Sequence, residues 1–175
     1  VSVTNINNVS AVTGVVTAVV TEQDATTLKT LLTNNSDMIT VKMAAASTAA
    51  ADLNAIDLLT GMSINATAIT ELTGNATDVK TALASSGITT VTNGSLAVNV
   101  NSGTASVADI NTINADSATG IVTATATETA AATLIGLTTT GTDAITVTMA
   151  AASTAAADLN TIDGKTSVTV GATAI

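Results

Sequence analysis

The sequence predicts a mostly β repeat protein, a parallel β-solenoid in which each turn of about 24 residues holds one strand and one short helical or irregular segment. Three observations lead to this prediction. The stretch M-A-A-A-S-T-A-A-A-D-L-N begins at Met43 and recurs unchanged at Met149. Runs in which every second residue is apolar recur at a nearly constant interval. The chain has no aromatic residue, so its core must consist of small aliphatic side chains, which suit a thin core of equivalent layers.

A longer repeat has a period of 106 residues. Gly14–Ile69 aligns with Gly120–Ile175, and 34 of these 56 positions are identical. The sequence therefore predicts the end of a preceding unit at residues 1–13, one full repeat at 14–119 and a partial second repeat at 120–175. Because the second copy stops inside the repeat, we expect the chain to be a segment of a longer array.

Alternating runs predict strands that start near residues 16, 39, 64, 98, 122 and 145. Successive starts are 23 to 25 residues apart, except for one step of 34. The long step contains a predicted loop or hairpin insertion near residues 84–96, with Asn93-Gly94 as its turn. After each run, two apolar residues three or four positions apart predict one side of a short helix. These pairs are Leu28 and Leu31, Leu53 and Ile56, Val79 and Leu83, Ile110 and Ile113, Leu134 and Leu137, and Leu159 and Ile162.

Tandem β-sandwich modules are the alternative fold, because 106 residues is a common size for such a module. However, Ala44–Ala51 has poor strand propensity and starts a helix well. A unit of about 24 residues cannot bury its apolar face alone, whereas stacked neighbours can. The solenoid is therefore the favoured prediction.

The composition excludes several classes of function. The net charge is −9, with four lysines and no arginine, so the chain has no electrostatic attraction for a nucleic-acid backbone. No apolar run reaches the roughly 18 residues that a membrane span needs. The chain has no histidine or cysteine, and its lysines lack a Ser-x-x-Lys context, so we expect no enzyme activity. The absence of aromatic rings and arginine argues against a small-molecule substrate such as a sugar.

The motif A-D-[LI]-N-x-I-[DN] supplies candidate calcium ligands, because calcium prefers carboxylate and amide oxygens. No D-x-D-x-D-G loop and no G-G-x-G-x-D nonapeptide accompanies it. The other interpretation is that Asp and Asn cap helix ends and turn the chain between units. The candidate ligands are Asp52, Asn54 and Asp57, then Asp109, Asn111 and Asn114, and finally Asp158, Asn160 and Asp163.

The outward strand positions predict a polar ladder along the solenoid. Threonine and asparagine ladders form hydrogen bonds between neighbouring strands and stabilise a sheet. A second interpretation is a flat T-x-T face that orders water, as in ice-binding solenoids, with Thr123–Thr127 and Thr146–Thr148 at its centre. Val19, Lys42 and the asparagines interrupt that array. The ladder residues are Thr17, Thr40, Asn65, Asn99, Thr123, Thr146 and Thr169.

Three segments carry a resemblance to a known kind of protein: V-T-A-T-A-T-E-T-A-A-A-T-L, A-A-D-L-N-T-I-D-G-K-T and V-G-A-T-A-I. They resemble repeats of very long Ala/Thr-rich bacterial surface or adhesin-like proteins of the marine cyanobacterial type, and the resemblance covers nearly the whole chain. It implies an extracellular or cell-surface location and a structural role. It supplies no catalytic residue.

Together these observations predict a non-catalytic structural repeat of a long extracellular protein, which forms a stalk, a surface coat or a self-assembling filament. Its expected partners are copies of itself or adjacent repeats of the same chain, with divalent cations as candidate stabilisers. One alternative is a binding module, either an ice-binding solenoid or an adhesin repeat. Another is a phage or viral fibre segment, although the sequence shows no continuous apolar stripe for contact between chains.

Overall fold

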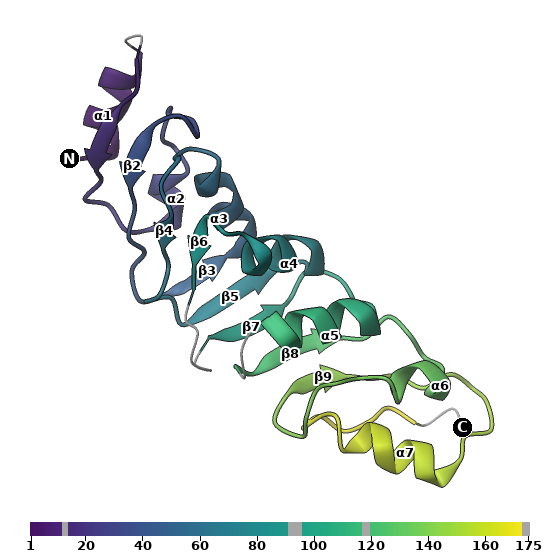
Figure 1. Ribbon diagram of the computed structural model, residues 1–175. Helices are drawn as coiled ribbons and strands as arrows, with labels where there is room; N and C mark the ends of the chain where they lie inside the picture. The colour runs from purple at the N-terminus through teal and green to yellow at the C-terminus, as the bar shows by residue number, and fades with distance from the viewer. Residues whose placement is uncertain (12–13, 91–95, 117–119, 173–175) are drawn as a thin grey trace.

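The computed structural model describes residues 1–11, 14–90, 96–116 and 120–172 as one stack of helices and strands that runs from the N-terminus to the C-terminus (Figure 1). The helices are α1 (Val3–Ser10), α2 (Ala25–Leu28), α3 (Ala50–Asp57), α4 (Ala76–Ala84), α5 (Val107–Asp116), α6 (Ala131–Leu134) and α7 (Ala156–Asp163). The strands are β1 (Thr17–Val19), β2 (Met38–Thr40), β3 (Ser47–Ala49), β4 (Ile64–Asn65), β5 (Glu71–Gly74), β6 (Ile88–Thr89), β7 (Ala97–Val100), β8 (Val122–Thr125) and β9 (Ala144–Thr146). We call one helix, with the strands and loops that lead to it, a unit.

Each strand pairs in parallel with a strand of a neighbouring unit. Within the described residues the strands form a five-stranded sheet in the order β3-β5-β7-β8-β9 and two smaller sheets, β1-β2 and β4-β6. The register joins residues about one unit apart, for example Thr48 with Leu72 and Leu72 with Val98. A parallel connection needs a dozen or more residues, and each unit supplies them as a loop and a helix.

The predicted fold class is wrong. The sequence predicted a mostly β solenoid, but the structure is an α/β fold with a five-stranded parallel sheet and seven helices among the described residues, of which 31% are helical and 20% are in strands. Of the segments expected to be short helical or irregular, α3, α4, α5 and α7 form helices of 8 to 10 residues, whereas α2 and α6 are short helices of four residues. The alternative of β-sandwich modules is also wrong, because such modules need antiparallel strands and the strand pairs of the described residues are parallel.

The positions of the predicted strands are confirmed. The six alternating runs correspond to β1, β2, β4, β7, β8 and β9, and the six apolar pairs lie in or just after α2 to α7. The insertion near residues 84–96 begins with β6, which pairs in parallel with β4. The predicted Asn93-Gly94 turn lies outside the described residues.

Four elements were not predicted, namely α1, β3, β5 and β6. Strand β3 has the sequence Ser-Thr-Ala, which lacks both alternation and the large β-branched residues typical of strands. The same three residues recur at Ser153–Ala155, where they are not in a strand. Pairing with β5 therefore makes Ser47–Ala49 a strand, and local sequence alone does not.

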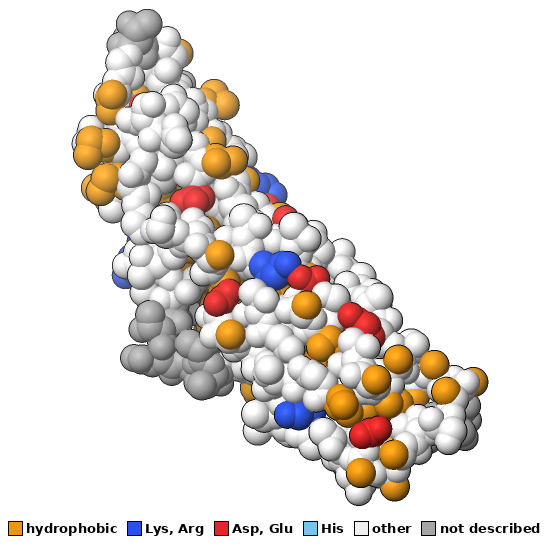
Figure 2. All heavy atoms as spheres, turned by 45° about the vertical axis from the view of Figure 1, so that its right-hand side comes forward, with side chains coloured by type: hydrophobic (Ala, Val, Ile, Leu, Met, Phe, Trp, Pro, Cys, Tyr) orange, Lys and Arg blue, Asp and Glu red, His pale blue; other side chains and the backbone are white. Residues whose placement is uncertain are grey.

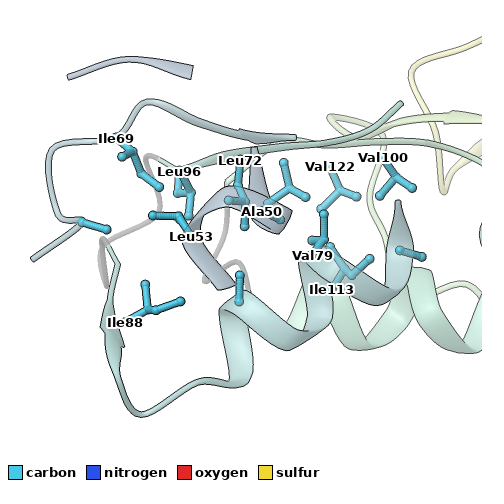
Figure 3. Close-up of a cluster of buried hydrophobic side chains, with 14 of the residues drawn as sticks. Ala50, Leu53, Ile69, Leu72, Val79, Ile88, Leu96, Val100, Ile113 and Val122 are labelled. Carbon is cyan, nitrogen blue, oxygen red and sulfur yellow. The ribbon is translucent and has the colours of Figure 1, made fainter. Parts of the chain in front are cut away.

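The core is a layer of aliphatic side chains between the sheet and the helices (Figure 3). Leu72 of β5 and Leu53 of α3 are fully buried. Figure 3 shows Val122 of the sheet pointing toward the helix layer, where Val79 of α4 and Ile113 of α5 lie. Because each unit adds a similar set of small apolar residues, the layer continues along the stack without aromatic side chains.

We predict that Leu53→Ala and Leu159→Ala have unequal effects on stability, although the two leucines occupy the same place in identical sequences. Leu53 is 0% exposed, whereas Leu159 is only partly buried at the C-terminal end of the stack. Leu53→Ala should lower the free energy of unfolding by about 2–5 kcal/mol through the lost contacts and the cavity that remains. Leu159→Ala should cost clearly less. Urea unfolding followed by circular dichroism measures both, and equal losses would contradict the difference in burial.

Candidate functional site

The A-D-[LI]-N-x-I-[DN] motif lies at the same place on α3, α5 and α7, and in the first two helices it connects neighbouring units. Its aspartate pairs with a lysine of the preceding helix. Lys29 Nζ lies 2.8 Å from Asp52 Oδ1, and Lys80 of α4 pairs in the same way with Asp109 of α5. In α3 and α5 the motif therefore joins the helix to the unit before it.

The asparagine of the motif bonds in the opposite direction, to the unit that follows. Asn54 Nδ2 donates to the carbonyl of Asp78 at 3.0 Å. Asn111 Nδ2 donates to the carbonyl of Gly136 at 2.8 Å, and its Oδ1 accepts from the amide of Thr138 at 2.8 Å. These are bonds to backbone groups, so they fix the distance between units whatever side chains the next unit carries.

The third polar residue of the motif also contacts the following unit. Asp57 Oδ2 accepts a hydrogen bond of 2.8 Å from Ser85 Oγ. Asn114 Nδ2 donates to the carbonyl of Thr138 at 3.3 Å. The first six candidate calcium ligands thus bond to neighbouring units, and calcium binding stays a prediction. Within the described residues, no group of three or more acidic, histidine or cysteine side chains is placed to hold a metal ion.

The third copy of the motif lies on α7, at the C-terminal end of the stack (Figure 1). Ile135 stands where the first repeat has Lys29, so Asp158 faces no lysine at that position. Asn160 and Asp163 are exposed, in contrast to Asn54 and Asp57, which the next unit partly covers. The same motif is therefore engaged on both sides in α3 and presented to solvent in α7.

A second set of bonds between units centres on the buried aspartates Asp37 and Asp143, and we call each set an aspartate clasp. Asp37 Oδ1 accepts from the amide of Val16 at 2.7 Å, and Oδ2 accepts from the amide of Asn34 at 2.9 Å. The Asp37 carbonyl accepts from the amide of Gly61 at 2.7 Å. One residue thus connects three successive units. Asp143 makes the equivalent bonds to Val122, Thr140 and Ser167.

A buried threonine completes each clasp. Thr60 Oγ1 accepts from the amide of Ile39 at 3.0 Å and donates to the carbonyl of the same residue at 2.8 Å. Thr166 does the same for Ile145, at 2.9 and 2.7 Å. The threonine hydroxyl thus bonds to both backbone groups of one strand residue, as the backbone of a neighbouring strand would. These threonines and aspartates are almost fully buried, at 3–6% exposure.

Sequence reasoning did not identify the clasps. A carboxylate before a strand normally indicates a turn, and burial of an aspartate is uncommon unless it is hydrogen-bonded. One signal was available. Asp37 and Thr60 are unchanged as Asp143 and Thr166, although 22 of the 56 aligned positions of the repeat differ. Retention made these residues candidates for a structural bond, but it did not separate them from exposed retained residues such as Thr40.

The predicted polar ladder is divided among separate sheets. Thr17 and Thr40 lie on β1 and β2, but Thr17 faces Met38 and Thr40 faces Val19. Asn65 lies on β4 and bonds locally to Thr67. In the five-stranded sheet Asn99 faces Thr123, whereas Thr146 faces Thr125. Thr169 is exposed near the C-terminal end. The structure therefore brings together Asn99 and Thr123 and leaves the other ladder residues without a ladder partner in register.

Two shallow grooves occur at equivalent places in the two copies of the repeat. One has a volume of about 170 Å³ and is lined by Gln23–Thr26 and by residues between Ala44 and Asp52. The other has a volume of about 300 Å³ and is lined by Thr129–Ala132 and by residues between Ala150 and Asp158. Both are walled mainly by alanine, serine and threonine, so neither brings together a set of groups for acid–base or nucleophilic chemistry.

No protein-family model, curated protein or solved structure matches this chain. In the part of the chain that the structure describes, no helix is both long enough and apolar enough to cross a membrane. The functional interpretation therefore depends on the contacts between units.

We predict that Thr60→Val destabilises the protein by about 1–3 kcal/mol, although it keeps the side-chain volume. The change leaves the buried amide and carbonyl of Ile39 without their hydroxyl partner. Thr40→Val is the matched control, because Thr40 is exposed on β2, and it should change stability by less than about 0.5 kcal/mol. Denaturant unfolding measures both variants, and a neutral Thr60→Val would show that the clasp contributes nothing.

We also predict acid destabilisation through Asp109. The hydrogen bond from Lys80, followed by that from Ser106, lowers the pKa of this carboxyl below 3.8. A lowered folded-state pKa gives stability that is present above the unfolded value and is lost as the pH falls through the folded value. Asp109→Asn should therefore reduce the loss of unfolding free energy below about pH 4. Asp116→Asn, which removes the same charge from an exposed site, should leave that loss unchanged. Equal pH profiles for the two variants would contradict the assignment.

Proposed function

We propose that the chain is a non-catalytic structural repeat of a long extracellular protein, which forms a stalk, a surface coat or a self-assembling filament. The observation that carries this proposal is that the same bonds between neighbouring units occur twice, 106 residues apart. The aspartate clasps are one example. A bonding scheme that repeats with the sequence puts equivalent units of successive 106-residue repeats in equivalent positions, which is what a regular stalk or filament requires.

The backbone bonds repeat even where the side chains differ. The amide of Met43 donates to the carbonyl of Asn65, and the amide of Met149 donates to the carbonyl of Gly171. Likewise the amides of Ala44 and Ala150 donate to residues of the preceding unit, Gln23 and Thr129. Because these bonds use main-chain groups, surface residues can change from copy to copy while the spacing of the units is kept.

The charge and the chemistry of the side chains support the same proposal. A net charge of −9 with four lysines gives no basis for binding nucleic acid. The two lysine–aspartate pairs of the described residues, Lys29 with Asp52 and Lys80 with Asp109, join units of the same chain. The partners we propose are accordingly adjacent repeats of the same chain or other copies of it, outside the cell or at its surface, with divalent cations as candidate stabilisers.

An ice-binding surface is a second candidate function, favoured by one feature of the sheet. Thr123 and Thr125 of β8 and Thr146 of β9 are exposed on its outer face, and Thr125 lies opposite Thr146 in register. Ala144 takes the place of a threonine opposite Thr123, so the array is short. Thermal hysteresis of the purified protein tests this function, and its absence at millimolar concentration would rule it out.

Negative-stain electron microscopy of the purified chain, with and without millimolar calcium, tests the structural proposal. We expect elongated particles whose long axis follows the stack of units, and their growth into long regular fibres would identify the self-assembling filament. Fibres that need calcium would assign the cation to the exposed motif on α7, and Asp163→Asn should then abolish the calcium effect. Short single rods under both conditions would contradict self-assembly by the chain. Globular particles without an elongated shape would contradict the stalk and the coat as well.

A further inference from the structure

The twelve identical residues that begin at Met43 and Met149 form an internal comparison, because they have different surroundings. In the first copy, Thr48, Ala50 and Leu53 are buried. In the second copy, the equivalent Thr154 and Leu159 are only half-buried and Ala156 is exposed. Since the sequence is the same, the difference comes from what packs on it.

In the first copy the covering segment is β5 with α4. Strand β5 pairs with β3 through the register Ser47 to Glu71 and Ala49 to Thr73. The amide of Thr70 donates to the carbonyl of Ala46 at 3.1 Å. Helix α4 packs against α3, and its Val79 is fully buried. The segment thus covers the first copy with a strand edge, an apolar helix face and polar contacts at both ends.

The polar contacts of that joint are specific. Asn54 Nδ2 reaches the carbonyl of Asp78, and Ser85 Oγ donates to Asp57. Ser47 Oγ donates to the carboxylate of Glu71 at 2.7 Å. Each of the three polar residues on the covered side of the first copy thus forms a hydrogen bond with a group in β5, in α4 or directly after α4.

The second copy presents the same groups uncovered. We call the surface formed by Ser153–Ala155, Ala156, Leu159, Asn160 and Asp163 the C-terminal face. Its residues Ser153, Asn160 and Asp163 are exposed and are equivalent to Ser47, Asn54 and Asp57. Figure 2 shows hydrophobic side chains gathered at the lower end of the molecule, where Figure 1 places α6 and α7. The surface therefore combines the small apolar side chains Ala155, Ala156 and Leu159 with a defined set of hydrogen-bonding groups.

We propose that the C-terminal face is a docking surface for a strand–helix unit of the β5–α4 kind. This inference rests on the proposed structural function and adds the partner that one end of the stack selects. The partner brings a strand that pairs in parallel with Ser153–Ala155, an apolar helix face for Ala156 and Leu159, a backbone carbonyl for Asn160 and a hydroxyl for Asp163. On docking, Ser153–Ala155 becomes a strand, as Ser47–Ala49 is in the first copy.

The N-terminal end of a second molecule is a poorer occupant of this face. Helix α1 starts at Val3, with Ser2 as its N-cap, and it has the bonding pattern of α5. The amide of Val3 donates to the carboxylate of Glu22, as the amide of Val107 donates to that of Glu128. In the stack α5 packs on α4. A head-to-tail contact would therefore place an α5-like helix where an α4-like helix belongs. A β5–α4 unit fits the face, because its strand can pair with Ser153–Ala155 in the register that β5 has with β3.

An extended chain tests the proposal. A second copy of Thr70–Thr104 is placed directly after Ile175, which keeps the 106-residue period. Hydrogen exchange of the amides of Ala157–Ile162 is measured in the extended and the original chain. We expect exchange in the extended chain to slow by more than about tenfold, toward the rates of Ala51–Ile56. The matched control is the same extension with Leu72→Asp and Val79→Asp in the appended copy, which should restore fast exchange.

Every other outcome either overturns the proposal or leads to a second test, in which the segment is supplied as a separate peptide. An appended segment that stays unprotected, while Ala51–Ile56 keeps its protection, overturns it. If the extension lowers protection at Ala51–Ile56, the segment is supplied in trans as a Thr70–Thr104 peptide to the original chain, and absence of binding then overturns it. Sedimentation of the original chain as a dimer with protected α7 would show a second copy as the occupant and overturn our assignment. Fibres of the original chain without docking of the extension would support the proposed function and still overturn this inference.

Discussion

Parallel pairing between units is the constraint on which this molecule depends. The strands are two to four residues long, and such short strands have no stability without a neighbour to satisfy their backbone groups. The neighbour is always supplied by a unit 21 to 26 residues away in the sequence. Every unit must therefore keep nearly the same length, and every loop must return the chain to the same edge. The 106-residue repeat preserves this return through its loops and helices.

Polar residues occur inside the stack at the places where pairing stops. The sheets break between β2 and β3, and between β4 and β5, and the chain must leave one sheet and enter the next. Thr60 bonds to the amide and the carbonyl of Ile39 in β2, and Asp37 accepts from the amides of Val16 and Asn34, which precede β1 and β2. The clasp therefore satisfies backbone groups beside the small sheet β1-β2. Two backbone amides bond to the carboxylate oxygens of each buried aspartate.

The sequence predicted the strands in which apolar and polar residues alternate, because one face of each such strand is buried and the other is exposed. It did not predict β3 or β5, since Ser-Thr-Ala and Glu-Leu-Thr-Gly have no such pattern and become strands only through their neighbours. The fold class failed for a related reason. Segments rich in alanine gave little evidence of helix length, which depends on the tertiary contacts of α3, α4 and α5.

Within the candidate site, the motif on α3 and α5 was recognised, but its bonds to the adjacent units could not be foreseen. Its carboxylates accept from a lysine or a serine and its asparagine donates to a carbonyl, at 23 to 29 residues away, and such a partner is visible only in three dimensions.

The replacement of Lys29 by Ile135 makes the joints of the stack unequal. Tension along the stack loads all joints in series, so every joint carries the same force and the weakest one opens first. The joint between α6 and α7 lacks the lysine–aspartate pair that Lys29 and Asp52 form at the equivalent joint between α2 and α3. We expect this joint to open at a lower force than its counterpart between α2 and α3, where Lys29 pairs with Asp52. The two copies of the repeat therefore differ in mechanical strength at equivalent positions, although their sequences around the motif are the same.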